Sequence, residues 1–344
     1  MHVESIGRGP RVVFVHGSVW NGAATWASQR PLAQHLRLVV LNRPGFPPNP
    51  PVERVDFDED AVLVAKLLEP GDHLVGHSYG GVIALLAAAR RADDVGSLTV
   101  IEPPCFAVAA GEPAVALVVA QLREHWERGP REPERFLRRF AELVLGSAEW
   151  VPSPLPPALA QGARTLMVER GPWEAAVPLA ELRRARFPKL VVSGGHHAAF
   201  DAVCHVLERR LDAEHAVLEG ARHAAQRTAA FNATLVDFVE RGESPRRTNA
   251  RRRPTCRPAV ARSSVEPEDD GSDGTSGRGR RAHGSDVADF RLLGPVEVVR
   301  GRDAVPLGGR KQSTILALLL LEAGRVVPAD RLIDELWGPT VSCP

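Results

Sequence analysis

Between residues 1 and 242, short apolar segments alternate with longer helical patterns, and this alternation restricts the chain to a few architectures. Segments with helical spacing, such as Val82–Arg91 and Phe200–Leu211, separate the apolar runs. The candidate strands are Val12–Val15, Leu38–Leu41, His73–Val75, Ser97–Ile101, Leu190–Ser193 and His215–Leu218. Because strands that are apolar throughout must be buried on both faces, the pattern predicts an α/β domain with a mostly parallel sheet and helices on both faces.

One long segment interrupts the alternation. Residues 106–186 contain several helical patterns but no strand pattern, so we expect a helical insertion on the α/β core. Trp126, Trp150 and Trp173 lie in this insertion, where they are candidates for its core or for the lining of a pocket.

Composition excludes several classes of protein. The net charge of the 344 residues is +1, which gives no overall attraction to nucleic acid or to a membrane surface. The N-terminus lacks the basic start and apolar core of a signal peptide, and the longest apolar runs, such as Ile315–Leu321, are far shorter than the ~20 residues that span a bilayer. The four cysteines are scattered without CxxC spacing, which argues against a zinc site or a disulfide framework. We therefore expect a cytoplasmic protein without a metal.

The composition changes abruptly after residue 242. Residues 243–287 have few large apolar side chains, many Pro, Gly and Ser, and a basic block followed by an acidic one. Such a segment buries too little surface to offset its ordering entropy, so we expect a disordered linker.

The strongest chemical signal is Gly76-His77-Ser78-Tyr79-Gly80. It follows an apolar strand pattern and precedes a helical one, which is the context required for a G-x-S-x-G turn that exposes a nucleophilic serine. Ser78 is therefore the candidate nucleophile. The backbone N–H of Tyr79, directly after it, is a candidate donor to a developing oxyanion.

A base and a second oxyanion donor are expected on other loops. His223 follows the last predicted strand, and its place at a carboxyl end of the sheet favours it as the base among the 12 histidines. The loop that begins at His16 follows the first predicted strand, and Ser18 is our choice there for the second oxyanion N–H, with Val19 as the alternative.

Together, the HG loop at His16-Gly17, the GHSYGG turn, the helical insertion and the terminal GARH resemble the α/β-hydrolase superfamily over residues 1–242. The resemblance implies an eight-stranded type of sheet, a helical cap at about 106–186, no cofactor, and hydrolysis of a small-molecule acyl substrate through an acyl-enzyme. Relatives that open epoxides or displace halides use a carboxylate nucleophile, so the serine disfavours those reactions.

The third member of the triad departs from the commonest pattern of that superfamily. The acid usually follows the strand represented here by Leu190–Ser193, but His197 stands at that position. An imidazole cannot supply the anion that orients the base. Glu102, placed after an apolar strand and before two prolines, is our first choice, and Asp201 is the alternative; an enzyme without the acid is the third possibility.

Residues 288–344 recover a periodic pattern. Three segments of this region resemble the start of the OmpR-type winged-helix DNA-binding domain of actinobacterial antibiotic-regulatory proteins. They are FRLLGPVEV, VPLGGRKQSTILALLLLEAGRVV and RLIDELWG. The pattern predicts strands at Phe290–Leu293 and Val296–Val299 and helices near Gln312–Ala323 and Ala329–Trp337. The recognition helix and wing that would follow are not in the sequence, so we expect a truncated fragment and assign no residue to a DNA contact.

Two functions from different classes follow from these patterns. The first is a serine hydrolase of the carboxylic-ester-hydrolase type, acting on a small ester, thioester or lactone. The second is a transcriptional regulator in which a hydrolase-like domain senses a ligand. The complete serine turn and the terminal histidine favour the hydrolase.

Overall fold

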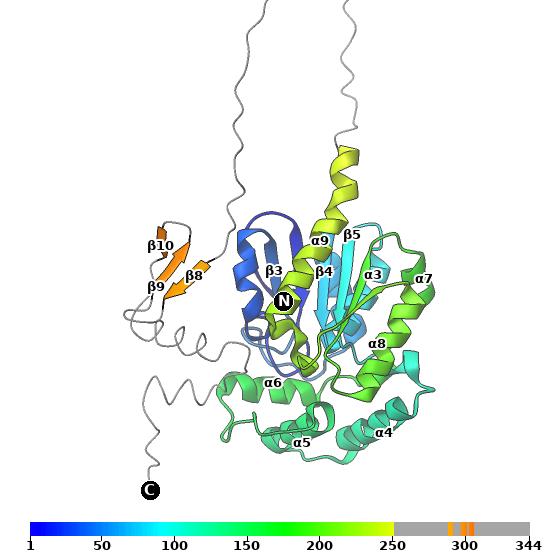
Figure 1. Ribbon diagram of the computed structural model, residues 1–344. Coiled ribbons are helices and arrows are strands. Elements are labelled where there is room, and N and C mark those ends of the chain that lie inside the picture. The colour runs from blue at the N-terminus through cyan, green and yellow to red at the C-terminus, as the bar shows by residue number, and fades with distance from the viewer. Residues whose placement is uncertain (251–287, 292–296, 301–302, 306–344) are drawn as a thin grey trace, which may run out of the picture. The chain divides into compact units, whose positions relative to one another are not determined.

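The computed structural model describes residues 1–250, 288–291, 297–300 and 303–305, with side chains described for residues 1–242. The chain divides into two compact units, Met1–Arg257 and Pro258–Pro344. The first unit contains the sheet and helices shown in blue to yellow in Figure 1. Within the described residues, no helix combines the length and the apolar character needed to cross a bilayer.

A seven-stranded sheet forms the centre of the first unit, in the order β1-β3-β2-β4-β5-β6-β7. All neighbouring strands are parallel except β1 and β3, which pair antiparallel. The strands are β1 (His2–Ile6), β2 (Arg11–Val15), β3 (Arg37–Asn42), β4 (Asp72–His77), β5 (Val95–Ile101), β6 (Lys189–Ser193) and β7 (Glu214–Val217). The mostly parallel α/β sheet is as predicted.

The sheet differs from the prediction at one edge. The sequence patterns predicted strands at β2 to β7 but not at β1, and the resemblance implied an eight-stranded type of sheet where the sheet of the first unit has seven strands in the described residues. Strand β1 has the sequence HVESI, and its residues are exposed or half-buried. Polar residues are tolerated there because an edge strand is covered less than a central one.

Helices cover both faces of the sheet. The helical elements before the insertion are α1 (Gly22–Thr25), η1 (Ala27–Gln34), α2 (Phe57–Leu67) and α3 (Tyr79–Arg90). Those after it are α8 (Ala198–Leu211), η4 (Arg222–Arg227) and α9 (Ala229–Ala250). One apolar cluster joins the sheet to α2, α3 and α8, and a second joins the opposite face to α9 through Phe231, Leu235 and Phe238.

Only helical elements follow β5 until β6 begins. They are η2 (Phe106–Ala109), α4 (Pro113–Arg128), α5 (Pro133–Leu145), α6 (Pro157–Met167), η3 (Pro172–Glu174) and α7 (Leu179–Arg184). Figure 1 shows α4, α5 and α6, here named the cap helices, across the edge of the sheet at which β4 ends. A third apolar cluster joins Val19 to α5 and α6, so the cap packs on the loop after β2.

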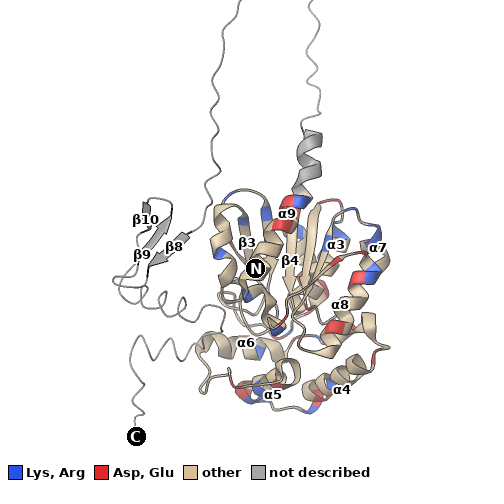
Figure 2. Ribbon diagram, in the orientation of Figure 1, with Lys and Arg blue, Asp and Glu red and all other residues tan. Residues whose placement is uncertain are grey.

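The surface of the first unit carries mixed charge. Figure 2 shows Lys and Arg interspersed with Asp and Glu along the outer helices, including α4, α5 and α7. This mixture agrees with the small net charge of the chain.

The second unit is described only as a three-stranded antiparallel sheet, in the order β10-β9-β8. Its strands are β8 (Ala288–Arg291), β9 (Glu297–Arg300) and β10 (Asp303–Val305). The two predicted strands overlap β8 and β9. The predicted helices of the winged-helix fragment lie outside the described residues, as does the predicted linker beyond Ala250; helix α9 extends into the first part of that linker range.

Candidate active site

Ser78 lies in a strained turn between β4 and α3. Its backbone has φ 53° and ψ −126°, a conformation that a non-glycine residue rarely adopts. The Ser78 N–H donates to the carbonyl of Ile101 at 2.8 Å, and the Gly81 N–H donates to the carbonyl of Ser78 at 2.7 Å. These bonds hold the turn so that α3 begins directly after the serine.

A chain of hydrogen bonds connects Ser78 to His223 and Glu102. The Oγ of Ser78 is 3.0 Å from Nε2 of His223, and Nδ1 of His223 is 2.7 Å from Oε2 of Glu102. A carboxylate only accepts, so His223 carries its proton on Nδ1 and presents Nε2 as an acceptor to the serine hydroxyl. The structure thus brings together three residues that are far apart in the sequence.

Glu102 is the carboxylate that reaches His223. It directly follows β5 and is fully buried, and its other oxygen, Oε1, accepts the N–H of Gly194 at 2.7 Å. Burial raises the pKa of Glu102, but hydrogen bonds and charge interactions with His196 and His223 outweigh it and lower the pKa to about 2. The group is therefore an anion throughout the neutral range.

The two other residues considered for the acid position have different surroundings. Asp201 lies in the first turn of α8, and within the described residues no hydrogen bond joins it to His223. His197 is the N-cap of the same helix, where Nδ1 accepts the N–H of Ala199 at 3.2 Å. Both side chains thus belong to the start of a helix.

Backbone strain is concentrated in the loops that carry the site. In the described part of the chain, positive φ angles occur at five non-glycine residues: Val19, Ser78, Glu102, Asp212 and Arg222. All but Asp212 lie in loops that follow β2, β4, β5 and β7. Strain of this kind is kept only where the surrounding structure enforces it, and it clusters at functional sites.

Gly194 allows the turn after β6 to approach the loop that carries the candidate base His223, here named the base loop. A Cβ at this position would lie 1.9 Å from the carbonyl oxygen of Arg222, the residue before His223. Gly194 also donates its backbone N–H to Glu102. Only glycine fits here, because the backbone of the neighbouring loop occupies the space of a side chain.

The loop after β2, which holds Ser18 and Val19, is fixed by a buried ionic network. Arg43 donates from Nη1 to the carbonyl of Gly17 at 3.0 Å and from Nη2 to Glu169 at 2.9 Å, and Glu169 accepts the hydroxyl of Ser18 at 2.5 Å. Asp60 accepts from Arg43 Nε at 3.0 Å. Burial raises the pKa of both carboxyls, and the Arg43 charge opposes that shift.

Sequence reasoning did not find this network. Arg43 follows β3 directly, in Leu41-Asn42-Arg43-Pro44, and a charged residue that ends an apolar strand is the same signal that drew attention to Glu102. Glu169 has no comparable local signal. It lies in the segment after α6 and meets Arg43 only in the folded chain.

His77 is hydrogen-bonded to the main chain of His223. Its Nε2 donates to the carbonyl of His223 at 2.8 Å. Burial, together with the neighbouring His223, lowers the pKa of His77 to about 3, so it is neutral at physiological pH. It is therefore a neutral hydrogen-bond donor that fixes the His223 main chain.

Ser78 borders two cavities of different character. The first is a small, partly enclosed apolar chamber of about 20 Å³, lined by Phe106, Leu122, Trp126, Trp173 and Phe200 as well as by Ser18, Ser78 and Tyr79. The second is an open groove of about 460 Å³, lined by Trp20, Trp150, Arg222, His223 and Arg227 as well as by Ser18, Val19 and Ser78. Of the three tryptophans of the insertion, Trp126 and Trp173 thus line the chamber and Trp150 lines the groove.

Among the side chains that the structure describes, two groups of histidine and glutamate have atoms close enough to share an ion. Glu102, His196 and His223 form one, and His205, Glu208 and His215 form the other. In the first group Nδ1 of His223 and Oε2 of Glu102 are already joined by a direct hydrogen bond of 2.7 Å. The second group contains no residue of the site described above.

A mostly parallel α/β sheet with a Ser–His–Glu arrangement at the carboxyl ends of its strands defines the class of protein. A family model described as "Alpha/beta hydrolase family" matches residues 12–234. The chain belongs to the alpha/beta hydrolase family.

Relatives and solved structures agree with this assignment. The chain is 36% identical to a pimeloyl-[acyl-carrier protein] methyl ester esterase of Aeromonas salmonicida, over 33% of this chain and 46% of that protein. The chain thus spans about half the length of that relative. A protein of the same name from Shewanella woodyi is 27% identical, over 58% of this chain and 91% of the relative.

Structural similarity extends over most of the first unit. An alpha/beta hydrolase from Sphaerobacter thermophilus is 24% identical with a TM-score of 0.50, covering 69% of this chain and 95% of that one. MenH from S. aureus is 14% identical with a TM-score of 0.56, covering 71% and 99%. At these identities the likeness concerns the fold.

Proposed function

We propose that the chain is a cytoplasmic serine hydrolase that cleaves a small carboxylic ester, thioester or lactone through an acyl-enzyme on Ser78. The observation that carries the proposal is the continuous set of hydrogen bonds from Ser78 through His223 to the buried Glu102. A serine hydroxyl is a weak nucleophile until a base takes its proton, and this arrangement supplies that base in the correct tautomer.

Each residue then has a defined step. Ser78 Oγ attacks the acyl carbon while its proton passes to Nε2 of His223, and the Glu102 carboxylate stabilises the imidazolium. The N–H groups of Tyr79 and Ser18 bind the oxyanion, the Tyr79 group being at the positive end of α3. His223 next protonates the leaving oxygen or sulfur, and water repeats the sequence in reverse to release the acid. The reaction uses only groups of this chain and water.

The two cavities orient the substrate. His223 must protonate the leaving group, and His223 lines the groove but not the chamber. The leaving group therefore lies in the open groove and the acyl group in the chamber. Since the chamber is far smaller than the groove, about 20 against about 460 Å³, the proposed substrate has a short, apolar acyl group and a larger alcohol or thiol part.

The proposed substrate differs from the one in the relatives' name in which of its two parts is the larger. A methyl ester of pimeloyl-[acyl-carrier protein] has a small alcohol part and a long acyl part. Beside Ser78 the cavity proposed for the acyl group is the smaller one and the groove proposed for the leaving group is the larger one, which favours acetyl-type esters for this chain.

Activity-based labelling and a chain-length series test the proposal. We expect a fluorophosphonate probe to label the wild-type chain and not Ser78→Ala, and p-nitrophenyl acetate to be hydrolysed faster than the butyrate and much faster than the octanoate. A folded chain that is neither labelled nor active refutes the hydrolase. Labelling together with a preference for octanoate, or for methyl octanoate, refutes only the placement of the acyl group.

A further inference from the structure

We infer that His196 is a positioning residue for the proposed reaction, an imidazolium that holds the Glu102 carboxylate on one side and the main chain of cap helix α5 on the other. The inference rests on the proposed function, because Glu102 is there the partner of the base. His196 belongs to the turn after β6 and had no role in the sequence-based prediction of the site.

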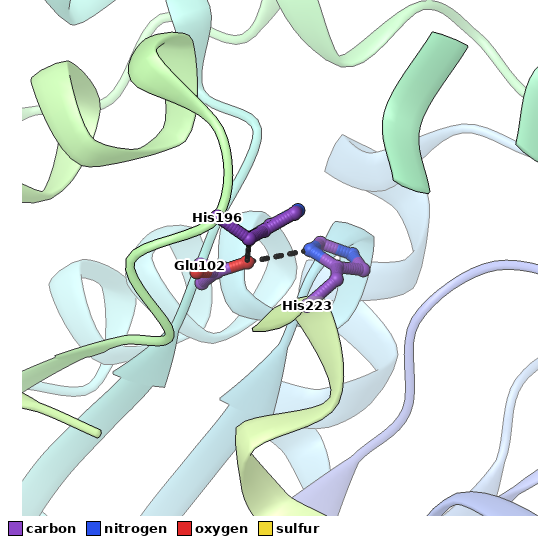
Figure 3. Close-up of side chains that lie close together, drawn as sticks. All are labelled: Glu102, His196 and His223. Carbon is purple, nitrogen blue, oxygen red and sulfur yellow. Dashed lines mark hydrogen bonds and ion pairs between the residues drawn. The ribbon is translucent and has the colours of Figure 1, made fainter. Parts of the chain in front are cut away.

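The position of the ring identifies its protonation state. Nδ1 of His196 lies 3.3 Å from Oε2 of Glu102, and Nε2 lies 3.3 Å from the carbonyl oxygen of Val144 in α5. The side chain is 6% exposed, and Figure 3 shows it and His223 converging on the same carboxylate. Both neighbours are acceptors, and the contact of Nδ1 with Oε2 is an ion-pair contact rather than an aligned hydrogen bond. A neutral ring that donates from Nε2 to Val144 would place the Nδ1 lone pair beside the carboxylate, whereas the imidazolium places a positive charge there.

The surrounding groups agree with a cation at this position. Glu102 and Asp201 attract a positive charge there, whereas His197 and His223 oppose one when they are protonated. Arg222, from the base loop, donates to the carbonyl of Leu145 beside Val144. Burial lowers the pKa of His196, but the interaction with the Glu102 carboxylate outweighs it and raises the pKa.

The shared oxygen links His196 to the base. Oε2 of Glu102 interacts with both imidazoles, whose ring centres are 5.6 Å apart. A positive charge on His196 repels a second positive charge on His223. Removal of this charge stabilises the protonated form of His223, so the acid limb of the pH–rate profile should move to higher pH.

The decisive variant is His196→Phe, which keeps a ring against Phe200, 5.8 Å away, and removes both N–H groups. The matched control is His197→Asn, since asparagine also caps a helix. We expect the acid limb of kcat/KM for p-nitrophenyl acetate to rise by about one pH unit in His196→Phe, with a several-fold lower plateau, and to stay in place in His197→Asn.

A second measurement does not depend on turnover. In ¹⁵N-histidine NMR of the wild-type chain at pH 7, we expect both ring nitrogens of His196 to be protonated. A neutral His196 ring overturns the inference, and so does an unchanged acid limb in His196→Phe or an equal shift in His197→Asn. If the wild-type chain has no hydrolase activity, the proposed function fails, and NMR still decides whether the cationic bridge exists.

Discussion

At the scale of single residues, the site depends on one buried carboxylate with several donors. Glu102 accepts from Gly194 and His223 and lies beside His196, while its own backbone is held at a positive φ of 44°. A buried anion is stable only when such partners compensate for lost hydration. Glu102 should therefore affect both turnover and stability.

Substitution of the acid distinguishes the two carboxylates that the sequence offers, Glu102 and Asp201. We expect Glu102→Gln to lower kcat by about 10²–10⁴, because a neutral amide cannot stabilise the protonated His223. Asp201→Asn should stay within a factor of about three of the wild type, since its side chain has no hydrogen bond to the base. Steady-state hydrolysis of p-nitrophenyl acetate measures both. Full activity of Glu102→Gln would contradict the assignment.

Acid denaturation should also report on Glu102. Its pKa is lowered from an ordinary 4.5 to about 2, so its contribution to folding is fully present above pH 4.5 and disappears as the pH falls towards 2. We expect the free energy of unfolding of the wild type to fall by about 3 kcal/mol more than that of Glu102→Gln between pH 5 and pH 2. Urea titrations at a series of pH values measure the difference, and parallel pH profiles would exclude it.

At the scale of secondary-structure elements, the site is a meeting of loops at the carboxyl ends of the strands. The loops after β2, β4, β5 and β7 each hold a residue at positive φ, and the turn after β6 contributes Gly194 and His196. Rigid strands fix where each loop starts, so the loops can hold strained conformations with little freedom to relax.

Gly194→Ala tests this close contact. The added methyl group would overlap the Arg222 carbonyl, which must move and take His223 with it. A displacement of about 1 Å is enough to lower kcat about 10²-fold. We expect that loss in the hydrolysis assay, with normal activity in the control Gly111→Ala, because no atom lies within 4 Å of a Cβ at Gly111. Equal activity of the two variants would show that the base loop tolerates the displacement.

The elements and the site differ in how far the sequence predicts them. Strands β2 to β6 contain apolar runs, so local composition identifies them, whereas the polar edge strand β1 carries no such signal. Ser78 and His223 stand in local motifs. The choice between Glu102 and Asp201 depends on the backbone direction after β5, which a local sequence pattern does not give. The Arg43–Glu169 pair joins residues far apart in the sequence, so it does not follow from a local pattern either.

At the scale of the whole molecule, every residue assigned to the site lies in the first unit. The candidate nucleophile, base, acid and oxyanion donors fall between Ser18 and His223, and the family match ends at residue 234. Helix α9 is still needed for folding, because Phe231, Leu235, Phe238 and Val239 are buried against the sheet. The minimal active chain should therefore include α9.

Two truncations test where the functional unit ends. A chain ending at Arg257 keeps the first unit intact, so we expect its fluorophosphonate labelling rate and melting temperature to match those of the full chain. A chain ending at Thr228 loses four buried side chains of α9. Each large apolar side chain contributes about 2–5 kcal/mol, and the total approaches the 5–15 kcal/mol that stabilises a typical domain.

The shorter chain should therefore be unfolded by circular dichroism and unlabelled. Loss of labelling in the chain ending at Arg257 would show instead that residues 258–344 take part in the hydrolase. In that case the second unit would have to supply either a structural contact or a group of the site, and adding it back as a separate chain would distinguish a covalent requirement from a docking one.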